Sequence, residues 1–277
     1  MKYTHFLNGQ FVDEDDLLVS ARDLGYARGY AIFEFMMTHN GRVFMLEKHM
    51  DRLFRSSDAI SLELPWSKEQ ISNWVVQTLD ANKSIEDEKV IRVTISGGPS
   101  FGLAPAEVPT IAIVIDARFP HIPEDYANGV RVLLTEFERY IPQAKTNNYI
   151  EAVRQFRTAP AEIDEILYHS KGMMREGTRS NIFAVIDGAL VTPKTGILEG
   201  ITRDIILNKL SLSIQAEVRD FSVEDLLRAS EVFITATGKE IMSVTKINDV
   251  TVGDGSVGRI TKEVATEFRN FFESDLW

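Results

Sequence analysis

A single lysine, Lys145, stands in a short polar stretch between two patterned segments of the chain. Residues 130–134 before it are apolar and predict a strand, and the residues from about Asn148 to Thr158 predict a helix. A lysine at such a strand-to-helix junction is either a solvated loop residue or an amine that attacks a carbonyl to form a Schiff base.

Residues 198–204, LEGITRD, form a candidate anion site. A glycine precedes a predicted helix that begins at Ile201, and the free N–H groups and dipole of a helix N-terminus attract phosphate. Side chains that could contribute to this site are Thr202, Arg203, Arg52, Thr235 and Thr237.

Glu176 stands just before a predicted hairpin strand, in a turn rich in small polar residues. A lysine amine, a phosphate-binding helix and a carboxylate on a strand are the groups that pyridoxal 5′-phosphate requires. The amine forms the Schiff base, the helix binds the phosphate, and the carboxylate keeps the pyridine nitrogen protonated.

The composition excludes several other functions. The chain has 277 residues, a net charge of −11 and no basic tract, which argues against nucleic acid and anionic membranes as partners. It has no cysteine, and its five histidines lack metal-ligand spacing, so no metal site is expected. Without an apolar signal segment or a membrane-length apolar run, we expect a cytoplasmic protein.

The elements that would position these residues include three hairpins. Their turns are predicted at Asn8-Gly9, Asn40-Gly41 and Asp187-Gly188, dipeptides that accept the positive φ of a type I′ turn. Hairpins mixed with helices predict an α+β protein of two domains. The predicted organisation is a small N-terminal domain at 1–118, a proline-containing linker at 119–126, and a larger C-terminal domain at 127–277 that carries Lys145.

The stretch Gly253-Asp254-Gly255-Ser256-Val257-Gly258 matches a dinucleotide-binding fingerprint by spelling alone. It lies 19 residues from the end of the chain, so no βαβ unit can follow it. We predict a turn and a helix start at this place.

Taken together, the motifs resemble those of the fold-type IV pyridoxal-phosphate enzymes. The resemblance runs over nearly the whole chain, in the order FLNG, RDLGYARGYAIFE (22–34), HMDRL, KTNNY, EGTRSNIF, LVTP, LEGITRD, EVFITATG and VGDGSVGRIT. That family includes branched-chain, D-amino-acid and (R)-amine transaminases and aminodeoxychorismate lyase. The resemblance implies a two-domain α+β fold with a β-barrel-like core in the larger domain. It also implies pyridoxal 5′-phosphate as cofactor and a homodimer with shared active sites.

Carried over by motif, Lys145 would be the Schiff-base lysine and the proton shuttle of the reaction, and Glu176 would face the pyridine nitrogen. The remaining cofactor-binding residues implied by the resemblance are Arg52, Ile201, Thr202 and Thr237 at the phosphate and Tyr149 near the phenolic oxygen. Phe33 and Asn181 would belong to the pocket wall or to the residues behind it. Lys171, Lys239 and Lys246 lack the strand–lysine–helix setting of Lys145, although Lys239 is close enough in sequence to Thr237 to reach the pocket.

Three arginines could bind substrate carboxylates through paired hydrogen bonds, namely Arg28, Arg92 and Arg179. The predicted reaction therefore moves an amino group between an amino acid and a 2-oxo acid such as 2-oxoglutarate. The segment Val90-Ile91-Arg92 lacks the tyrosine usual in branched-chain enzymes, and RVTISGGPSFG lacks the Arg-x-His pair of well-known D-amino-acid enzymes.

The missing tyrosine favours a D-amino acid such as D-alanine or D-glutamate as substrate. The alternatives are a branched-chain L-amino-acid aminotransferase, an aminodeoxychorismate-lyase-like enzyme and an (R)-amine transaminase. A non-enzymatic cofactor-binding protein with this fold is the alternative from another class, but Lys145 and Glu176 are both present.

Overall fold

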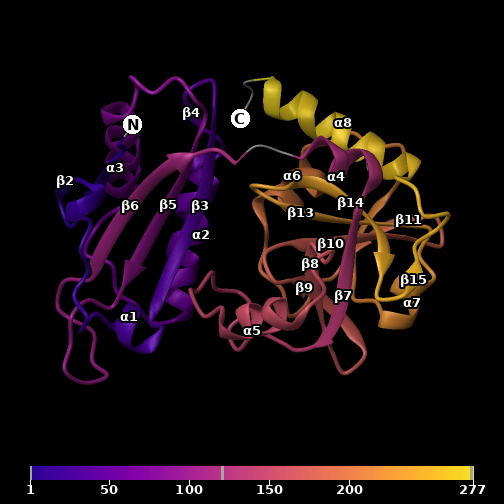
Figure 1. The fold of residues 1–277 in the computed structure, drawn as a ribbon, viewed down its shortest axis with the longest axis horizontal. Helices are drawn as coiled ribbons and strands as arrows, with labels where there is room; N and C mark the ends of the chain where they lie inside the picture. Colours follow the sequence, from indigo (N-terminus) through magenta and orange to yellow (C-terminus); the bar gives the residue numbers. More distant parts are fainter. Residues whose placement is uncertain (1, 120–121, 275–276) are drawn as a thin grey trace. The chain divides into compact units, whose positions relative to one another are not determined.

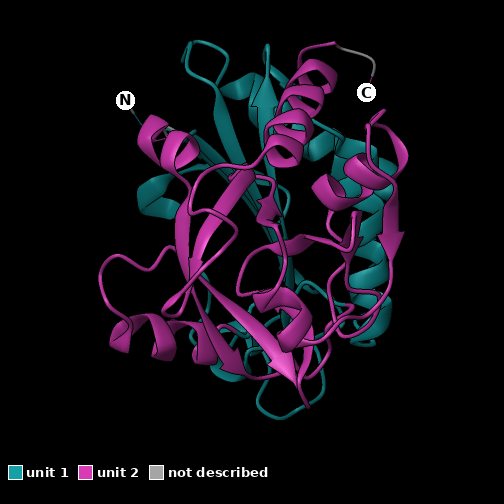
Figure 2. Cartoon of the chain, turned by 90° about the vertical axis from the view of Figure 1, so that its right-hand side faces the viewer, with its two compact units in different colours: residues 1–119, 144–148 teal, residues 120–143, 149–277 magenta. Residues whose placement is uncertain are grey.

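The structure, a computed structural model, describes residues 2–119, 122–274 and 277 (Figure 1). Its contacts divide the chain into two compact units, coloured separately in Figure 2: residues 1–119 with 144–148, and residues 120–143 with 149–277. Each unit mixes helices with a sheet built largely from hairpins, so the predicted α+β class is confirmed.

In the first unit the strands run in the order β2-β1-β6-β5-β3-β4. The strands are β1 (Thr4–Leu7), β2 (Gln10–Asp13), β3 (Ala31–His39), β4 (Arg42–Val43), β5 (Lys89–Ser96) and β6 (Thr110–Ala117). The helices are η1 (Glu14–Asp16), α1 (Leu24–Arg28), α2 (Leu46–Ala59) and α3 (Lys68–Ala81). Two predicted Asn-Gly turns join β1 to β2 and β3 to β4, with positive φ at both residues of each turn.

One face of this sheet forms a core with α2 and α3. Ile32 and Met36 of β3 pack with Met50 and Leu53 of α2, and isoleucines and valine from β5 and β6 complete the cluster. α3 begins where Ser67 accepts a hydrogen bond from the Gln70 N–H, the cap that a serine before a helix predicts. This core fixes α2 against β3, which matters below because both elements carry candidate site residues.

The segment 144–148 lies with the first unit, whereas the sequence predicts Lys145 inside the second domain. The reason is backbone pairing with β3: the Phe33 N–H donates to the Lys145 carbonyl oxygen at 2.9 Å, and Ile32 and Thr146 form an antiparallel bridge. Part of the predicted linker, residues 120–121, lies outside the described residues. Its end forms the start of α4 (Pro123–Asn128), because proline at the first position of a helix is compatible with helical φ.

In the second unit the strands run in the order β12-β11-β10-β13-β14-β7-β8-β9, with β15 paired to β14. The strands are β7 (Val130–Glu136), β8 (Glu165–Ser170), β9 (Met173–Gly177), β10 (Asn181–Ile186), β11 (Ala189–Thr192), β12 (Ala216–Val218), β13 (Glu231–Ala236), β14 (Glu240–Ile247) and β15 (Val250–Thr251). Its helices are α4, α5 (Ile150–Thr158), α6 (Ile201–Asn208), α7 (Val223–Leu227) and α8 (Arg259–Glu273). The predicted Asp187-Gly188 turn joins β10 to β11.

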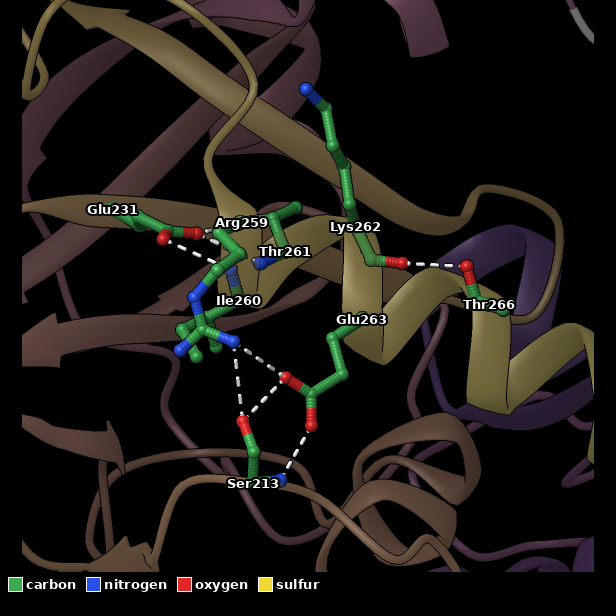
Figure 3. Close-up of polar contacts among 8 residues, drawn as sticks. All are labelled: Ser213, Glu231, Arg259, Ile260, Thr261, Lys262, Glu263 and Thr266. Carbon is green, nitrogen blue, oxygen red and sulfur yellow. Dashed lines mark hydrogen bonds and ion pairs between the residues drawn. The ribbon is translucent and has the colours of Figure 1, made fainter.

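The glycine-rich stretch at residues 253–258 is a turn followed by the start of α8, as predicted. The Glu231 carboxylate accepts hydrogen bonds from the Ile260 and Thr261 N–H groups at 3.0 and 2.8 Å (Figure 3). A protein carboxylate thus occupies this helix N-terminus, so the stretch is not a phosphate-binding loop.

None of the helices in the described part of the chain has the length and apolar character needed to span a membrane.

Candidate functional site

Lys145 is fixed by its backbone on two sides. Its N–H donates to Ser56 Oγ of α2 at 3.1 Å, and its carbonyl oxygen accepts from the Phe33 N–H of β3. The side-chain Nζ lies 4.5 Å from the centroid of the Phe33 ring. A flexible amine is therefore held at a defined place over an aromatic side chain of the first unit.

Arg92 approaches the same aromatic ring. Its guanidinium carbon lies 4.8 Å from the Phe33 ring centroid and 5.6 Å from that of Phe35, as expected for arginine stacked on aromatic faces. The Arg92 and Lys145 cationic groups therefore both lie within 5 Å of one ring centroid. Phe33, a predicted pocket residue, brings these two candidate residues together.

Arg28 is placed differently from Arg92. It is exposed at the end of α1, where its guanidinium donates to the Ala27 carbonyl oxygen at 2.8 Å. Gly29 follows it with φ of 70°, and a Cβ there would come within 2.5 Å of Asn148 Oδ1. The glycine thus lets the chain after Arg28 pass close to the segment that carries Lys145.

Arg52 belongs to a buried network that the sequence did not predict. Its Nε and Nη2 donate to the two carboxylate oxygens of Glu34 at 2.8 and 2.7 Å, and His49 Nδ1 lies 2.7 Å from Glu34 Oε2. Glu34 and His49 are fully buried and Arg52 is 4% exposed. The bidentate pair fixes the guanidinium plane of Arg52, the residue predicted to bind phosphate.

The charges in this network follow from its surroundings. Burial alone would raise the pKa of Glu34, but the Arg52 guanidinium and His49 hold it well below its usual range. Burial lowers the pKa of His49, and the nearby Arg52 and Lys145 lower it further against the opposing effect of Glu34. At neutral pH Glu34 is therefore ionised, and His49 is neutral and donates its Nδ1–H to Glu34.

In the second unit, Glu176 on β9 is 5% exposed and held on both oxygens. Arg139 Nε donates to Oε1 at 2.7 Å, and the Leu198 N–H donates to Oε2 at 2.8 Å. A guanidinium at this distance favours the ionised form of a carboxylate. Arg139 was not predicted from the sequence, although it lies only six residues before Lys145.

The N-terminus of α6 begins at a glycine, which brings no capping side chain. Gly200 caps the helix without a side-chain hydrogen bond, and Asn181 Nδ2 fixes the preceding loop by donating to the Leu198 carbonyl oxygen at 2.7 Å. A Cβ at Gly200 would lie 1.9 Å from Asn181 Oδ1, so this close approach requires glycine. The predicted Ile201 and Thr202 are the first two residues of this helix.

Arg203 does not join this helix start as the sequence suggested. Its side chain is buried, and it donates to Thr192 Oγ1 at 3.1 Å and to the Pro193 carbonyl oxygen at 3.0 Å. Burial lowers the pKa of Arg203, against the opposing effect of nearby Glu199 and Asp204. These hydrogen bonds direct its guanidinium to the end of β11, where it has a structural role.

Two threonines lie at the end of β13. Thr235 pairs with Asn181 in the sheet, and its hydroxyl is buried without a hydrogen-bond partner among the described residues. Thr237 is half-buried in the turn between β13 and β14. Since buried hydroxyls are normally satisfied, the Thr235 hydroxyl is suited to a hydrogen bond with a bound ligand.

The other predicted residues of this unit lie at element ends. Tyr149 is the half-buried residue that precedes α5. Arg179 is exposed in the turn between β9 and β10, and its guanidinium carbon lies 5.5 Å from the Phe156 ring centroid.

Tyr168 of β8, which the sequence did not single out, is 2% exposed. Burial raises the pKa of Tyr168, and the carboxylates of Glu165, Glu151 and Glu176 and the phenol of Tyr149 raise it further, so its hydroxyl stays protonated.

Comparison with known proteins establishes the family. Residues 31–247 match the amino-transferase class IV family. The chain belongs to the class IV aminotransferases. A putative branched-chain-amino-acid aminotransferase of Methanocaldococcus jannaschii is 35% identical over 278 residues, covering 96% of this chain and 95% of the relative. A D-alanine aminotransferase of Staphylococcus epidermidis is 31% identical over 278 residues, covering 97% and 98%.

The fold of this class IV aminotransferase agrees with solved relatives. A crystal structure of a branched-chain aminotransferase from Thermoproteus uzoniensis with norvaline matches with a TM-score of 0.88 at 28% identity, covering 98% of this chain and 94% of the other. The predicted fold type IV and the prediction of an enzyme are confirmed. Pyridoxal-phosphate dependence, also predicted, is the property of this family. The relatives include both D-alanine and branched-chain enzymes, so membership leaves the substrate open.

Proposed function

We propose that this class IV aminotransferase moves an amino group between a D-amino acid, such as D-alanine or D-glutamate, and a 2-oxo acid such as 2-oxoglutarate. The observation that supports a carboxylate-bearing substrate is the shared contact of Lys145 and Arg92 with the Phe33 ring. It places an amine beside a guanidinium that can bind a carboxylate with two hydrogen bonds. Amino acids and 2-oxo acids share this carboxylate, whereas simple amines lack it. The D configuration rests on the missing tyrosine in Val90-Ile91-Arg92.

The residues present fit pyridoxal 5′-phosphate. The uncapped start of α6 and the unsatisfied Thr235 hydroxyl suit a phosphate, and the buried Glu176 carboxylate suits a protonated pyridine nitrogen. We assign the phosphate to the Ile201 and Thr202 N–H groups with further contacts from Arg52, Thr235 and Thr237, and the phenolic oxygen to Tyr149. Lys145 would hold the cofactor covalently.

Each residue then has a defined task in transamination. The bound cofactor supplies an electron-accepting ring and the carbon that receives the amino group. Lys145 Nζ takes a proton from the substrate α-carbon as general base and returns it as general acid. Glu176, oriented by the hydrogen bond from Arg139, would accept a hydrogen bond from the protonated pyridine nitrogen. Arg28, Arg92 and Arg179 are the candidates for binding the substrate carboxylates.

The branched-chain L-amino-acid reaction is the second candidate, because the relatives from Methanocaldococcus jannaschii and Thermoproteus uzoniensis carry that name. The first difference between the two candidates is the chirality of the amino acid. The decisive experiment is a half-reaction, in which the visible absorption band of the holoenzyme is recorded before and after addition of a single amino donor. The donors are D-alanine, D-glutamate, L-leucine and (R)-phenylethylamine, each added separately.

Loss of the band with the D-amino acids alone supports the proposal, and loss with L-leucine alone supports the branched-chain candidate. Loss with (R)-phenylethylamine would overturn the carboxylate argument. If no donor changes the band, a lyase reaction or a non-catalytic cofactor-binding protein becomes the better explanation. Lys145→Ala is the matched control: it should lose both the band and turnover while its far-ultraviolet circular dichroism stays that of the wild type.

We also propose that the enzyme is a homodimer. Large apolar side chains are exposed around the start of α1 and the loop after β5: Tyr26 is 79% exposed, Phe101 89% and Leu103 82%. The two segments are joined by backbone hydrogen bonds, one from the Leu24 N–H to the Gly98 carbonyl oxygen at 2.9 Å. Exposed apolar clusters of this kind mark interaction surfaces. Sedimentation of the wild type and of a Phe101→Ser, Leu103→Ser variant tests the proposal, because only a dimer that uses this surface would dissociate.

A further inference from the structure

The buried carboxylate of Glu165 has no part in the roles assigned above. Glu165 is the first residue of β8 and is 0% exposed. Oε1 accepts hydrogen bonds from Thr178 Oγ1 and, at 3.0 Å, from the Ile166 N–H. Oε2 accepts from Ser180 Oγ at 3.1 Å and from Lys239 Nζ at 3.3 Å. A single carboxylate thus binds side chains of two different turns.

Lys239 is held by hydrogen bonds of both its backbone and its side chain. It closes the turn at residues 237–239, between β13 and β14, and its carbonyl oxygen accepts from the Tyr126 hydroxyl at 2.9 Å. Its Nζ donates to the Asp164 carbonyl oxygen at 3.1 Å in addition to Glu165. The side chain is 22% exposed. Lys239 therefore connects the β13–β14 turn to the start of β8.

The two turns joined by this ion pair carry residues that are candidates for binding different ligands. Thr178 and Ser180 flank Arg179, the candidate for binding a substrate carboxylate, and Glu176 stands two residues before Thr178. Thr237, the candidate for the cofactor phosphate, stands two residues before Lys239. A shift of either turn would be transmitted to the other, because an unpaired buried carboxylate is strongly unfavourable.

We propose that Glu165 and Lys239 are positioning residues that couple phosphate binding at the Thr237 turn to carboxylate binding at the Arg179 turn. The proposal rests on the proposed function, since it takes the two ligands from there. Binding of either ligand fixes its own turn, and the ion pair then fixes the other turn before its ligand arrives. By linkage the effect is reciprocal, so each ligand tightens the binding of the other by the same factor.

A purely structural ion pair makes a different prediction. Its removal would lower the melting temperature without changing how one ligand affects the affinity of the other. The test therefore measures the dissociation constant of pyridoxal 5′-phosphate for the apoprotein, by visible absorption, with and without saturating 2-oxoglutarate. The ratio of the two constants is the coupling factor, and it does not depend on turnover.

We expect a coupling factor of about 5 or more in the wild type, the range of a modest allosteric coupling, and a factor close to 1 in Lys239→Met. The matched control is Lys246→Met, because Lys246 lies on the neighbouring β14 and pairs at 3.9 Å with the exposed Asp249. It should keep the wild-type factor. A Lys239→Met protein with the wild-type factor would overturn the proposal, as would a wild type whose factor is 1.

A second variant covers the case in which Lys239→Met does not fold. Ser180→Ala removes one hydrogen bond to Glu165 and keeps the ion pair, so we expect a coupling factor between those of wild type and 1. An unchanged factor in Ser180→Ala would also contradict the coupling. A wild type that binds no pyridoxal 5′-phosphate would instead overturn the proposed function, so the two failures can be told apart.

Discussion

Arg139 donates a hydrogen bond from Nε to Glu176 Oε1 at 2.7 Å, and the two residues are 37 positions apart in the sequence. With the Leu198 N–H on the other oxygen, the carboxylate cannot rotate freely. An oriented, ionised carboxylate is what a protonated pyridine nitrogen needs as its partner. Arg139 therefore has a defined role in the proposed reaction: it holds Glu176 in place.

The Arg139→Met variant tests this role. A hydrogen bond to a charged group contributes about 1.5–3 kcal/mol, so we expect turnover to fall at least about tenfold. The absorption of the bound cofactor should also change, because Glu176 loses the hydrogen bond that orients it. Arg154→Met is the control, since Arg154 pairs with Glu151 on an exposed surface of α5. Full turnover in Arg139→Met, with the cofactor retained, would mean that Leu198 alone suffices.

The sequence predicted those parts of the structure that depend on neighbouring residues. The Asn-Gly and Asp-Gly turns are determined within a few residues, and all three were found where predicted. The strand β14 was missed, because most of its residues are buried and it shows no apolar–polar alternation. The helix α4 was missed because its first residue, Pro123, looked like part of a linker.

The candidate site shows the same division. Lys145, Arg52 and Glu176 were predicted from short motifs, whereas the side chains that bind Arg52 and Glu176 were not. Glu34 binds Arg52 from 18 positions away, and Arg139 binds Glu176 from 37. A buried glutamate in an apolar strand such as β3 is the only local signal of such a partner, since a buried carboxylate requires a cation.

The buried His49 makes stability depend on pH. Its pKa is lowered in the folded protein, so between that value and about 6.5 the unfolded chain binds more protons than the folded one. The free energy of unfolding should therefore fall as pH falls from 7 to 5. Glu34 acts in the same direction only nearer pH 4, since its pKa is also lowered.

The matched variant is His49→Asn, whose amide can donate to Glu34 from the position of Nδ1 but does not titrate. Urea unfolding of the apoprotein at pH 7, 6 and 5 gives the comparison. We expect the wild type to lose stability more steeply than His49→Asn across this range. If the free energy of unfolding falls equally with pH in both proteins, protonation of His49 does not contribute to the loss of stability.

Two of the three candidate substrate arginines, Arg92 and Arg179, can be distinguished by comparing a 2-oxo acid with one carboxylate and a 2-oxo acid with two. Arg92 shares the Phe33 ring with Lys145, whereas Arg179 lies 5.5 Å from the Phe156 ring centroid. An arginine that binds the carboxylate common to all substrates should, when changed to glutamine, raise KM for both pyruvate and 2-oxoglutarate. If an arginine binds the second carboxylate, its change to glutamine should raise KM for 2-oxoglutarate alone. We expect a rise of about tenfold to a hundredfold, because a bidentate charged pair is replaced by a neutral side chain.

We expect Arg179→Gln to show the second pattern and Arg92→Gln the first, because Arg92 is the one beside the reacting amine. The dissociation constant of pyridoxal 5′-phosphate, measured on the same proteins, should change little in either variant. If it rises in parallel with KM, the arginine supports the fold of its turn or strand and does not bind substrate. Exchange of the two patterns would instead assign the common carboxylate to Arg179 and the second carboxylate to Arg92.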